Sequence, residues 1–182
     1  INKVPSFGKS FICIDDKNNN DLLKKIKIKN YYTYGTNSKS QFHIKNIKQV
    51  KELSEFDLAI NLPGKKKIII NKIKIPLLGI HNILNSTAAI AVALTIGISK
   101  NIIKSGLKEF KGVQRRFNKI FTYRETSFFD DYAHHPTEIK EVLNGVRAAY
   151  KKEEVICVFQ PHRISRLKDL KKEFSFSFKK AD

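Results

Sequence analysis

The sequence predicts an α/β fold in which a mixed sheet is followed by a βαβ unit, and three observations lead to this prediction. Short runs rich in β-branched and aromatic residues recur between turn residues, as in strands. Longer stretches, most of them after residue 82, have the apolar spacing of helices. Near the end, a strand, a helix and a strand follow one another, which is the order of a parallel crossover.

The first half of the chain is predicted to hold most of the sheet. The expected strands are Ser10–Ile14, Tyr31–Tyr34, Gln41–Ile47, Phe56–Ile60 and Lys67–Ile75, with a short helix over Asp21–Ile28. Gly35 and Pro63-Gly64 mark turns between them. Asn82 is expected to cap a buried, alanine-rich helix over Ile83–Ile98, which a second helix over Lys100–Phe110 follows.

The composition changes at Gly112–Phe117, and we place the domain boundary there, with domains at residues 1–114 and 115–182. The second domain is expected to contain strands at Lys119–Tyr123, Ser127–Phe129 and Glu154–Phe159, and helices at Pro136–Tyr150 and Leu167–Phe178. Proline suits the first turn of a helix because its missing N–H would be unpaired there. The strand-helix-strand order predicts that Ser127–Phe129 and Glu154–Phe159 are parallel.

The 182 residues carry a net charge of +18, which raises the question of a nucleic-acid partner. The lysines are spread along the whole chain, beside abundant Ile and Asn, which an A/T-rich coding sequence also produces. We therefore expect no nucleic-acid partner. A non-catalytic basic nucleic-acid-binding module stays open as the alternative function, and an unfolded remnant of a decaying gene is the third hypothesis.

Several patterns point to a cytoplasmic protein without a membrane segment. The longest apolar stretch, Ile83–Ile98, is shorter than the ~20 residues that span a bilayer. Cys13 and Cys157 lie in separate strand-like runs, which favours a reduced compartment over a disulfide scaffold. No CxxC or HExxH pattern indicates a metal site. The chain has no Met and starts at Ile1, so we expect an internal fragment or a processed chain.

The stretch from Asp130 to Glu138 is the first candidate site. It holds two acids, two histidines and a tyrosine where a predicted strand meets a predicted helix, the edge at which open α/β sheets bind ligands. If the two strands are parallel, Gln160–Arg166 emerges at the same edge and adds a histidine and two arginines. A solvated polar turn is the alternative for the first stretch alone.

Four segments resemble the Mur ligases in order and spacing. They are Gly79–Asn85, Gly112–Phe117, Asp130–Glu138 and Phe159–Arg166. Two positions depart from the family pattern: Leu78 stands where proline is usual, and Ile164 where an aromatic residue is usual. Neither change removes a charged group.

The resemblance implies the second half of a P-loop-type central ATP-binding domain, followed by the first part of a Rossmann-like C-terminal ligase domain. The Gly-Lys-Thr phosphate loop of the family is absent from the sequence. We therefore expect the isolated chain to be inactive. The implied reaction joins L-alanine to UDP-N-acetylmuramate through an acyl phosphate, a step of peptidoglycan precursor synthesis. ATP and Mg²⁺ are the implied cofactors, and we expect the metal ligands to lie outside this chain.

The resemblance also implies roles for individual residues. Those expected to bind the nucleotide are His81, Asn85, Arg116, Asp130, Asp131 and Tyr132. Those expected to be catalytic are His134, His135 and His162, and those expected to bind the L-alanine carboxylate are Arg163 and Arg166. A structural role at a helix start stays open for His81, and for one of His134 and His135. Arg115 is interpreted as a surface charge, and Asp15 and Asp16 as a turn at a strand end.

Overall fold

The computed structural model describes residues 3–27 and 30–182, and these form two compact units. Unit 1 comprises Ile1–Lys48, Glu55–Ile75 and Ile83–Glu109. Unit 2 comprises Gln49–Ser54, Pro76–Asn82 and Phe110–Asp182. Because some strands and one helix run from one unit into the other, we describe each unit by itself.

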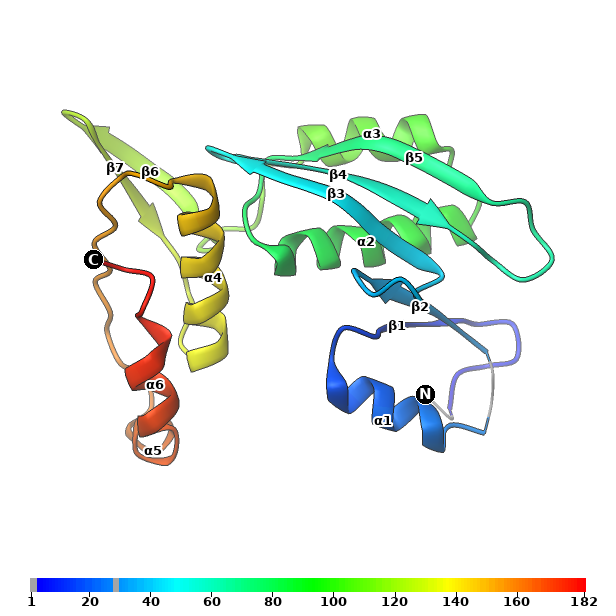
Figure 1. The fold of residues 1–182 in the computed structure, drawn as a ribbon, viewed down its shortest axis with the longest axis horizontal. Coiled ribbons are helices and arrows are strands. Elements are labelled where there is room, and N and C mark those ends of the chain that lie inside the picture. The colour runs from blue at the N-terminus through cyan, green and yellow to red at the C-terminus, as the bar shows by residue number, and fades with distance from the viewer. Residues whose placement is uncertain (1–2, 28–29) are drawn as a thin grey trace. The chain divides into compact units, whose positions relative to one another are not determined.

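Unit 1 is built on a five-stranded sheet with the order β1-β2-β3-β4-β5 (Figure 1). Its strands are β1 (Ser10–Cys13), β2 (Tyr31–Gly35), β3 (Phe42–Val50), β4 (Leu53–Ile60) and β5 (Ile68–Ile75). β1 and β2 are parallel, as are β2 and β3, and only two residues separate β3 from β4, the spacing of an antiparallel hairpin. The sheet is mixed, which confirms the predicted α/β class.

The core of unit 1 lies between this sheet and its helices. Phe56, Leu58 and Ile60 alternate along β4 and are almost fully buried, which is the period of two expected for a central strand. α2 (Ile80–Thr95) contributes the buried Ile83 and Ile90, and α3 (Lys100–Glu109) packs against β5 (Figure 1). None of the helices in the part of the chain that the structure describes is long and apolar enough to cross a membrane.

Two helix starts in this half differ from the predictions. α1 (Lys17–Lys25) begins four residues before Asp21 because the Asp16 side chain accepts hydrogen bonds from Asn18 N–H and Asn19 N–H. The predicted Asn82 cap is wrong. α2 already begins at Ile80, and the Asn82 amide donates to the Leu78 carbonyl from inside the helix, at 2.7 Å.

Unit 2 contains a hairpin and three helices. The antiparallel hairpin is β6 (Asn118–Tyr123) with β7 (Thr126–Asp130), and the helices are α4 (Pro136–Ala149), α5 (Ile164–Asp169) and α6 (Lys171–Ser177). α4 packs against α6 through a core of Ile139, Leu143 and Phe174. The single helix predicted over Leu167–Phe178 is wrong, since the helical conformation is interrupted at Leu170, which separates α5 from α6.

The strand predicted at Glu154–Phe159 is also wrong, because no strand is assigned there in the residues that the structure describes. The segment is extended. Val155 and Phe159 face the α4–α6 core, while Ile156 and Val158 are exposed. The Val155 N–H and carbonyl bond to Asp182 instead of to a strand, so the predicted parallel pairing with β7 does not form.

Candidate active site

Asp131 lies where β7 ends, and its carboxylate organises the turn that follows. One oxygen accepts a hydrogen bond from Ala133 N–H at 2.6 Å, and the other accepts one from Phe117 N–H at 2.8 Å. Burial raises the pKa of Asp131, although these two bonds and the nearby Arg116 and His81 work in the opposite direction. The side chain therefore ties Gly112–Phe117 to the corner between β7 and α4.

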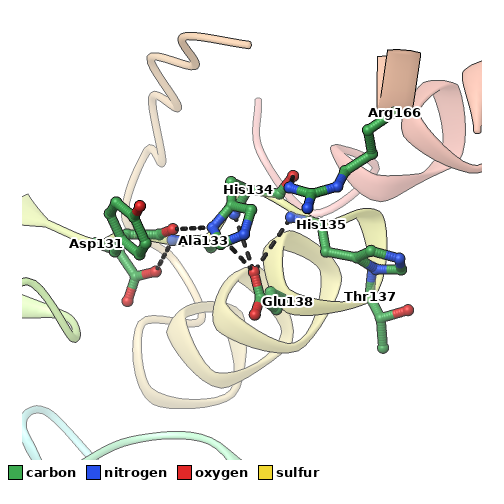
Figure 2. Close-up of polar contacts among 8 residues, drawn as sticks. Asp131, Ala133, His134, His135, Thr137, Glu138 and Arg166 are labelled. Atoms are coloured by element: carbon green, nitrogen blue, oxygen red, sulfur yellow. Dashed lines mark hydrogen bonds and ion pairs between the residues drawn. The ribbon is translucent and has the colours of Figure 1, made fainter. Parts of the chain in front are cut away.

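Glu138 also lies at this corner, although the motifs predicted no role for it. Its Oε2 accepts hydrogen bonds from His134 N–H at 3.0 Å and His135 N–H at 3.2 Å (Figure 2). Burial alone would raise the pKa of Glu138, but the hydrogen bonds from these two N–H groups, together with the nearby His134 ring and the Arg116 charge, outweigh it and lower the pKa. The capping-box spacing, with Glu138 at the third helical position, is the signal that could have found it.

The two adjacent histidines have opposite hydrogen-bonding roles. His134 Nδ1 lies 2.8 Å from the Tyr132 carbonyl, which only accepts, so Nδ1 carries a hydrogen and the neutral ring presents Nε2 as an acceptor. His135 Nδ1 accepts from Thr137 N–H at 3.3 Å, so its neutral ring carries the hydrogen on Nε2. His135 is the N-cap of α4, while His134 stands inside the corner (Figure 2).

Arg166 brings the second predicted segment to the same corner. Its Nη1 donates to the His134 carbonyl at 3.3 Å (Figure 2). The His162 and His134 ring centroids lie 6.2 Å apart. These segments meet although the parallel strand pairing that was expected to join them is absent from the described residues. Packing of α4 against α6 replaces it.

Arg163 directly precedes α5, at its N-cap position, and is exposed. Its φ of 68° lies in the left-handed region, which a residue with a Cβ adopts at a cost of about 1–3 kcal/mol. Strain of this kind is concentrated at ligand-binding positions, so it is compatible with the predicted role of Arg163 in binding a carboxylate.

His81 is partly buried within unit 2, in the first turn of α2. Burial lowers the pKa of His81, Arg116 lowers it further, and the carboxylates of Glu141 and Asp131 oppose this shift. Its Nδ1 is buried and has no hydrogen-bond partner within residues 3–27 and 30–182. A neutral imidazole in this position leaves a ring nitrogen for a ligand.

Arg116 lines a cavity of about 220 Å³ that lies entirely within unit 2. Lys111 and Lys119 add positive charge to its wall, and the Phe117 and Phe129 rings stack at 4.4 Å to form an aromatic side. Glu52 compensates part of this charge through Lys119 Nζ, at 3.2 Å. The cavity therefore suits a small anion or an aromatic group that carries negative charge.

Three predicted residues lie at the edge of this arrangement or outside it. Asp130 forms an ion pair with Arg115, and Tyr132 is half exposed between Arg115 and His134. Asn85 is exposed on the second turn of α2, in unit 1. Among residues 3–27 and 30–182, no group of three or more His, Cys, Asp or Glu side chains could hold a metal ion.

Comparison with protein families identifies the chain. The model described as Mur ligase middle domain matches residues 1–93, and the model described as Mur ligase, glutamate ligase domain, matches residues 115–182. The chain belongs to the Mur ligase family. This confirms the resemblance seen in the four sequence motifs.

Individual Mur ligases are similar over the whole chain. UDP-N-acetylmuramate–L-alanine ligase of Pelagibacter ubique is 85% identical over 182 residues, and the ligase of the same name from Brachyspira hyodysenteriae is 44% identical over 184. Each match covers 100% of this chain but only 39% and 38% of the relative. The chain thus spans less than half the length of these Mur ligases.

Solved Mur ligase structures share the fold. UDP-N-acetylmuramate-alanine ligase MurC from Thermotoga maritima matches with a TM-score of 0.67 and 29% identity, covering 83% of this chain and 32% of that one. A murein peptide ligase from Psychrobacter arcticus matches with a TM-score of 0.59 and 26% identity, covering 90% of this chain and 33% of that one.

Proposed function

We propose that this chain is part of an ATP-dependent ligase that joins L-alanine to UDP-N-acetylmuramate, through an acyl phosphate, in peptidoglycan precursor synthesis. The observation that carries the proposal is the convergence of Asp131, His134 and Arg166 at one corner of a chain that is 85% identical to a ligase of that name. The comparisons do not favour a nucleic-acid-binding module.

The proposed domains are residues 1–114, as part of the ATP-binding domain, and 115–182, as part of the ligase domain. The ranges of the two family matches support this division. The proposed ligands are ATP, UDP-N-acetylmuramate and L-alanine, and the proposed location is the cytoplasm. Mg²⁺ would assist the phosphates, but no group in the described residues fits it, so we assign it no ligand here.

Arg166 is proposed to hold the L-alanine carboxylate, together with Arg163. A guanidinium is permanently charged and offers two parallel donors, which match the two oxygens of a carboxylate. Among the residues that the structure describes, the Arg166 side chain makes one hydrogen bond, from Nη1, so its other N–H groups are available to a ligand.

His134 is proposed to accept a hydrogen from the alanine amine through Nε2, since its Nδ1 is held by the Tyr132 carbonyl. His162, beside it, would orient the amino acid. His135 is proposed to act mainly through α4, whose first N–H groups it and Glu138 cap.

The remaining roles concern the nucleotide. Arg116 is proposed to bind phosphate oxygens from the wall of its cavity, and His81 and Asn85 to contact the adenine. Asp130, Asp131 and Tyr132 are proposed to lie along the ribose. For Asp131 the two backbone hydrogen bonds occupy one lone pair on each oxygen, which leaves one on each to accept from a hydroxyl.

A chimera tests this function. Residues 1–182 of this chain replace the matching segment of the Pelagibacter ubique ligase, and phosphate release is measured with ATP, UDP-N-acetylmuramate and L-alanine. We expect turnover that requires all three substrates. In the chimera, Arg166→Lys is expected to raise KM for L-alanine about 10- to 100-fold, because lysine keeps the positive charge but loses the two parallel donors that match a carboxylate. A folded chimera that forms no product contradicts the proposal.

A further inference from the structure

We propose that Arg115 is a positioning residue, which holds the Tyr132 ring and through it sets the orientation of the His134 imidazole. Arg115 immediately precedes Arg116 in the chain. Its φ of 58° lies in the left-handed region, so the side chains of Arg115 and Arg116 point into different surroundings. The inference rests on the proposed function of His134, but its structural part can be tested without activity.

Arg115 contacts the corner in three ways. Its carbonyl accepts a hydrogen bond from Tyr132 N–H at 2.8 Å, and its guanidinium carbon lies 4.8 Å from the centroid of the Tyr132 ring. Its Nε lies 3.6 Å from Asp130 Oδ2, so the ion pair holds the guanidinium plane over the phenol. A positive group at this distance from an aromatic face is attracted by the ring quadrupole.

Tyr132 passes this constraint to His134. The two rings meet edge to face, with centroids 4.9 Å apart and planes at 65°. The Tyr132 carbonyl also fixes Nδ1 of His134, at 2.8 Å. A displaced Tyr132 would therefore release the ring edge and the 2.8 Å hydrogen bond to Nδ1, and would leave Glu138 Oε2, 3.6 Å away, as the other neighbour of Nδ1.

Lysine cannot replace arginine in this geometry. A guanidinium is planar, so it can lie over the phenol ring while its edge faces the Asp130 carboxylate as an ion pair. An ammonium group is a compact point charge and satisfies only one of the two contacts at a time. This predicts that even the charge-conserving change Arg115→Lys disturbs His134.

Arg124 provides a matched control. It also lies over a tyrosine, with its guanidinium carbon 5.3 Å from the Tyr123 centroid, and it also has a left-handed φ, of 51°. It sits in the turn between β6 and β7, away from the histidines in sequence. Any general effect of losing an exposed arginine–tyrosine contact should therefore appear in Arg124→Lys as well.

The test uses the 182-residue chain with ¹⁵N-labelled histidine and compares ring-nitrogen shifts of the unsubstituted chain, Arg115→Lys and Arg124→Lys. In the unsubstituted chain, Nδ1 and Nε2 of His134 should be widely separated, with the hydrogen on Nδ1. Arg115→Lys should narrow this separation as the two tautomers mix, and should leave His135 unchanged because its cap is independent. Arg124→Lys should change neither ring.

Tyr132→Leu keeps the proposal falsifiable if Arg115→Lys does not fold. It retains Arg115 and Asp130 and removes the ring between Arg115 and His134, so it should narrow the same separation. Unchanged His134 shifts in either folded variant would overturn the proposal, as would equal changes in His134 and His135.

The chimeric ligase separates this inference from the proposed function. There, Arg115→Lys is expected to raise KM for L-alanine about two- to fivefold, the size of an exposed cation–π contact. A changed His134 tautomer in a chimera without ligase activity would leave the positioning role standing and refute the function. If the chimera is active but Arg115→Lys leaves the His134 ring-nitrogen shifts unchanged, the proposed function stands and the positioning role of Arg115 is refuted.

Discussion

Asp57 shows how one side chain stabilises two strained backbone positions. Asn46 in β3 and Lys72 in β5 both have left-handed φ values, of 52° and 53°. The Asp57 carboxylate, on β4 between them, accepts from the Asn46 amide and from Lys72 N–H, each at 2.7 Å. The Asn46 hydrogen bond is the main cause that lowers the pKa of Asp57 below 3.8, with the Lys72 N–H next.

We predict that Asp57→Asn destabilises β3–β5 by about 1–2 kcal/mol at neutral pH, because an amide cannot accept on both sides. The sign of the pH dependence follows from the lowered pKa. The stabilisation by the ionised Asp57 is fully present above pH 3.8, the ordinary pKa of an aspartate, and is lost as the pH falls through the lower pKa of the folded state. Urea unfolding, followed by the amide signals of β3–β5, measures the free energy of unfolding of the unsubstituted chain and of Asp57→Asn. The difference between these two free energies should become smaller at acidic pH.

Asp21→Asn serves as the control for this prediction, since Asp21 is exposed and forms a surface ion pair with Lys24, at 2.8 Å. Such a surface pair contributes little. If Asp21→Asn lowered the free energy of unfolding as much as Asp57→Asn does, the effect would come from the lost charge and not from the hydrogen bonds that Asp57 accepts from Asn46 and Lys72.

Two helices of the chain each contain one interior glycine, but for different reasons. Gly145 in α4 faces Gly79, and a Cβ built on it would lie 2.8 Å from Gly79 Cα and 2.9 Å from Gly79 N. A Cβ on Gly106 in α3 would meet nothing within 4 Å. Gly79 itself has a φ of 91°, and a Cβ built on it would lie 2.5 Å from His81 Cε1, so α4 closely adjoins the start of α2, where His81 lies.

We predict opposite effects of alanine at these two positions. Gly106→Ala should stabilise α3 by about 0.5–1 kcal/mol, because it restores helix propensity without a clash. Gly145→Ala should destabilise unit 2 by about 1–3 kcal/mol, because backbone atoms must move to admit the methyl group. Amide hydrogen exchange, measured separately in α3 and α4, reports each effect. Equal stabilisation of both helices would contradict the close approach of Gly145 to Gly79.

Across the whole molecule, the sequence predicted where helices and strands form better than it predicted which strands pair. Pro136 identified the first turn of α4, because its fixed backbone and missing N–H act within one residue. Asn82 failed as a cap because Gly79, with its positive φ, lets α2 begin earlier, a property of the turn that the Asn82 pattern does not contain. The motifs identified the residues of the corner, but they did not reveal the part that Glu138 plays.

The segment Glu154–Phe159 illustrates why pairing is harder to predict than local conformation. Most of its residues are apolar, so they indicate a strand, but the structure assigns neither a strand nor a helix to this segment. A strand also needs a neighbour for its backbone groups, and composition does not say which segment provides it. Here the Val155 backbone bonds to Asp182, and the outward side chains stay uncovered.

This exposed segment should govern the solution behaviour of the 182-residue chain. Ile156 and Val158 are 75% and 94% exposed on an extended backbone, the arrangement that promotes association between chains. We predict that Val158→Lys lowers concentration-dependent self-association several-fold, about the effect of one charge at an exposed strand. It should leave the α4–α6 core intact, because Val155 and Phe159 supply the contacts to that core. Sedimentation velocity measures the association.

Ile96→Lys is the control, since Ile96 is 70% exposed but directly follows a helix. An equal decrease in both variants would mean that added charge alone, and not the extended segment, determines self-association.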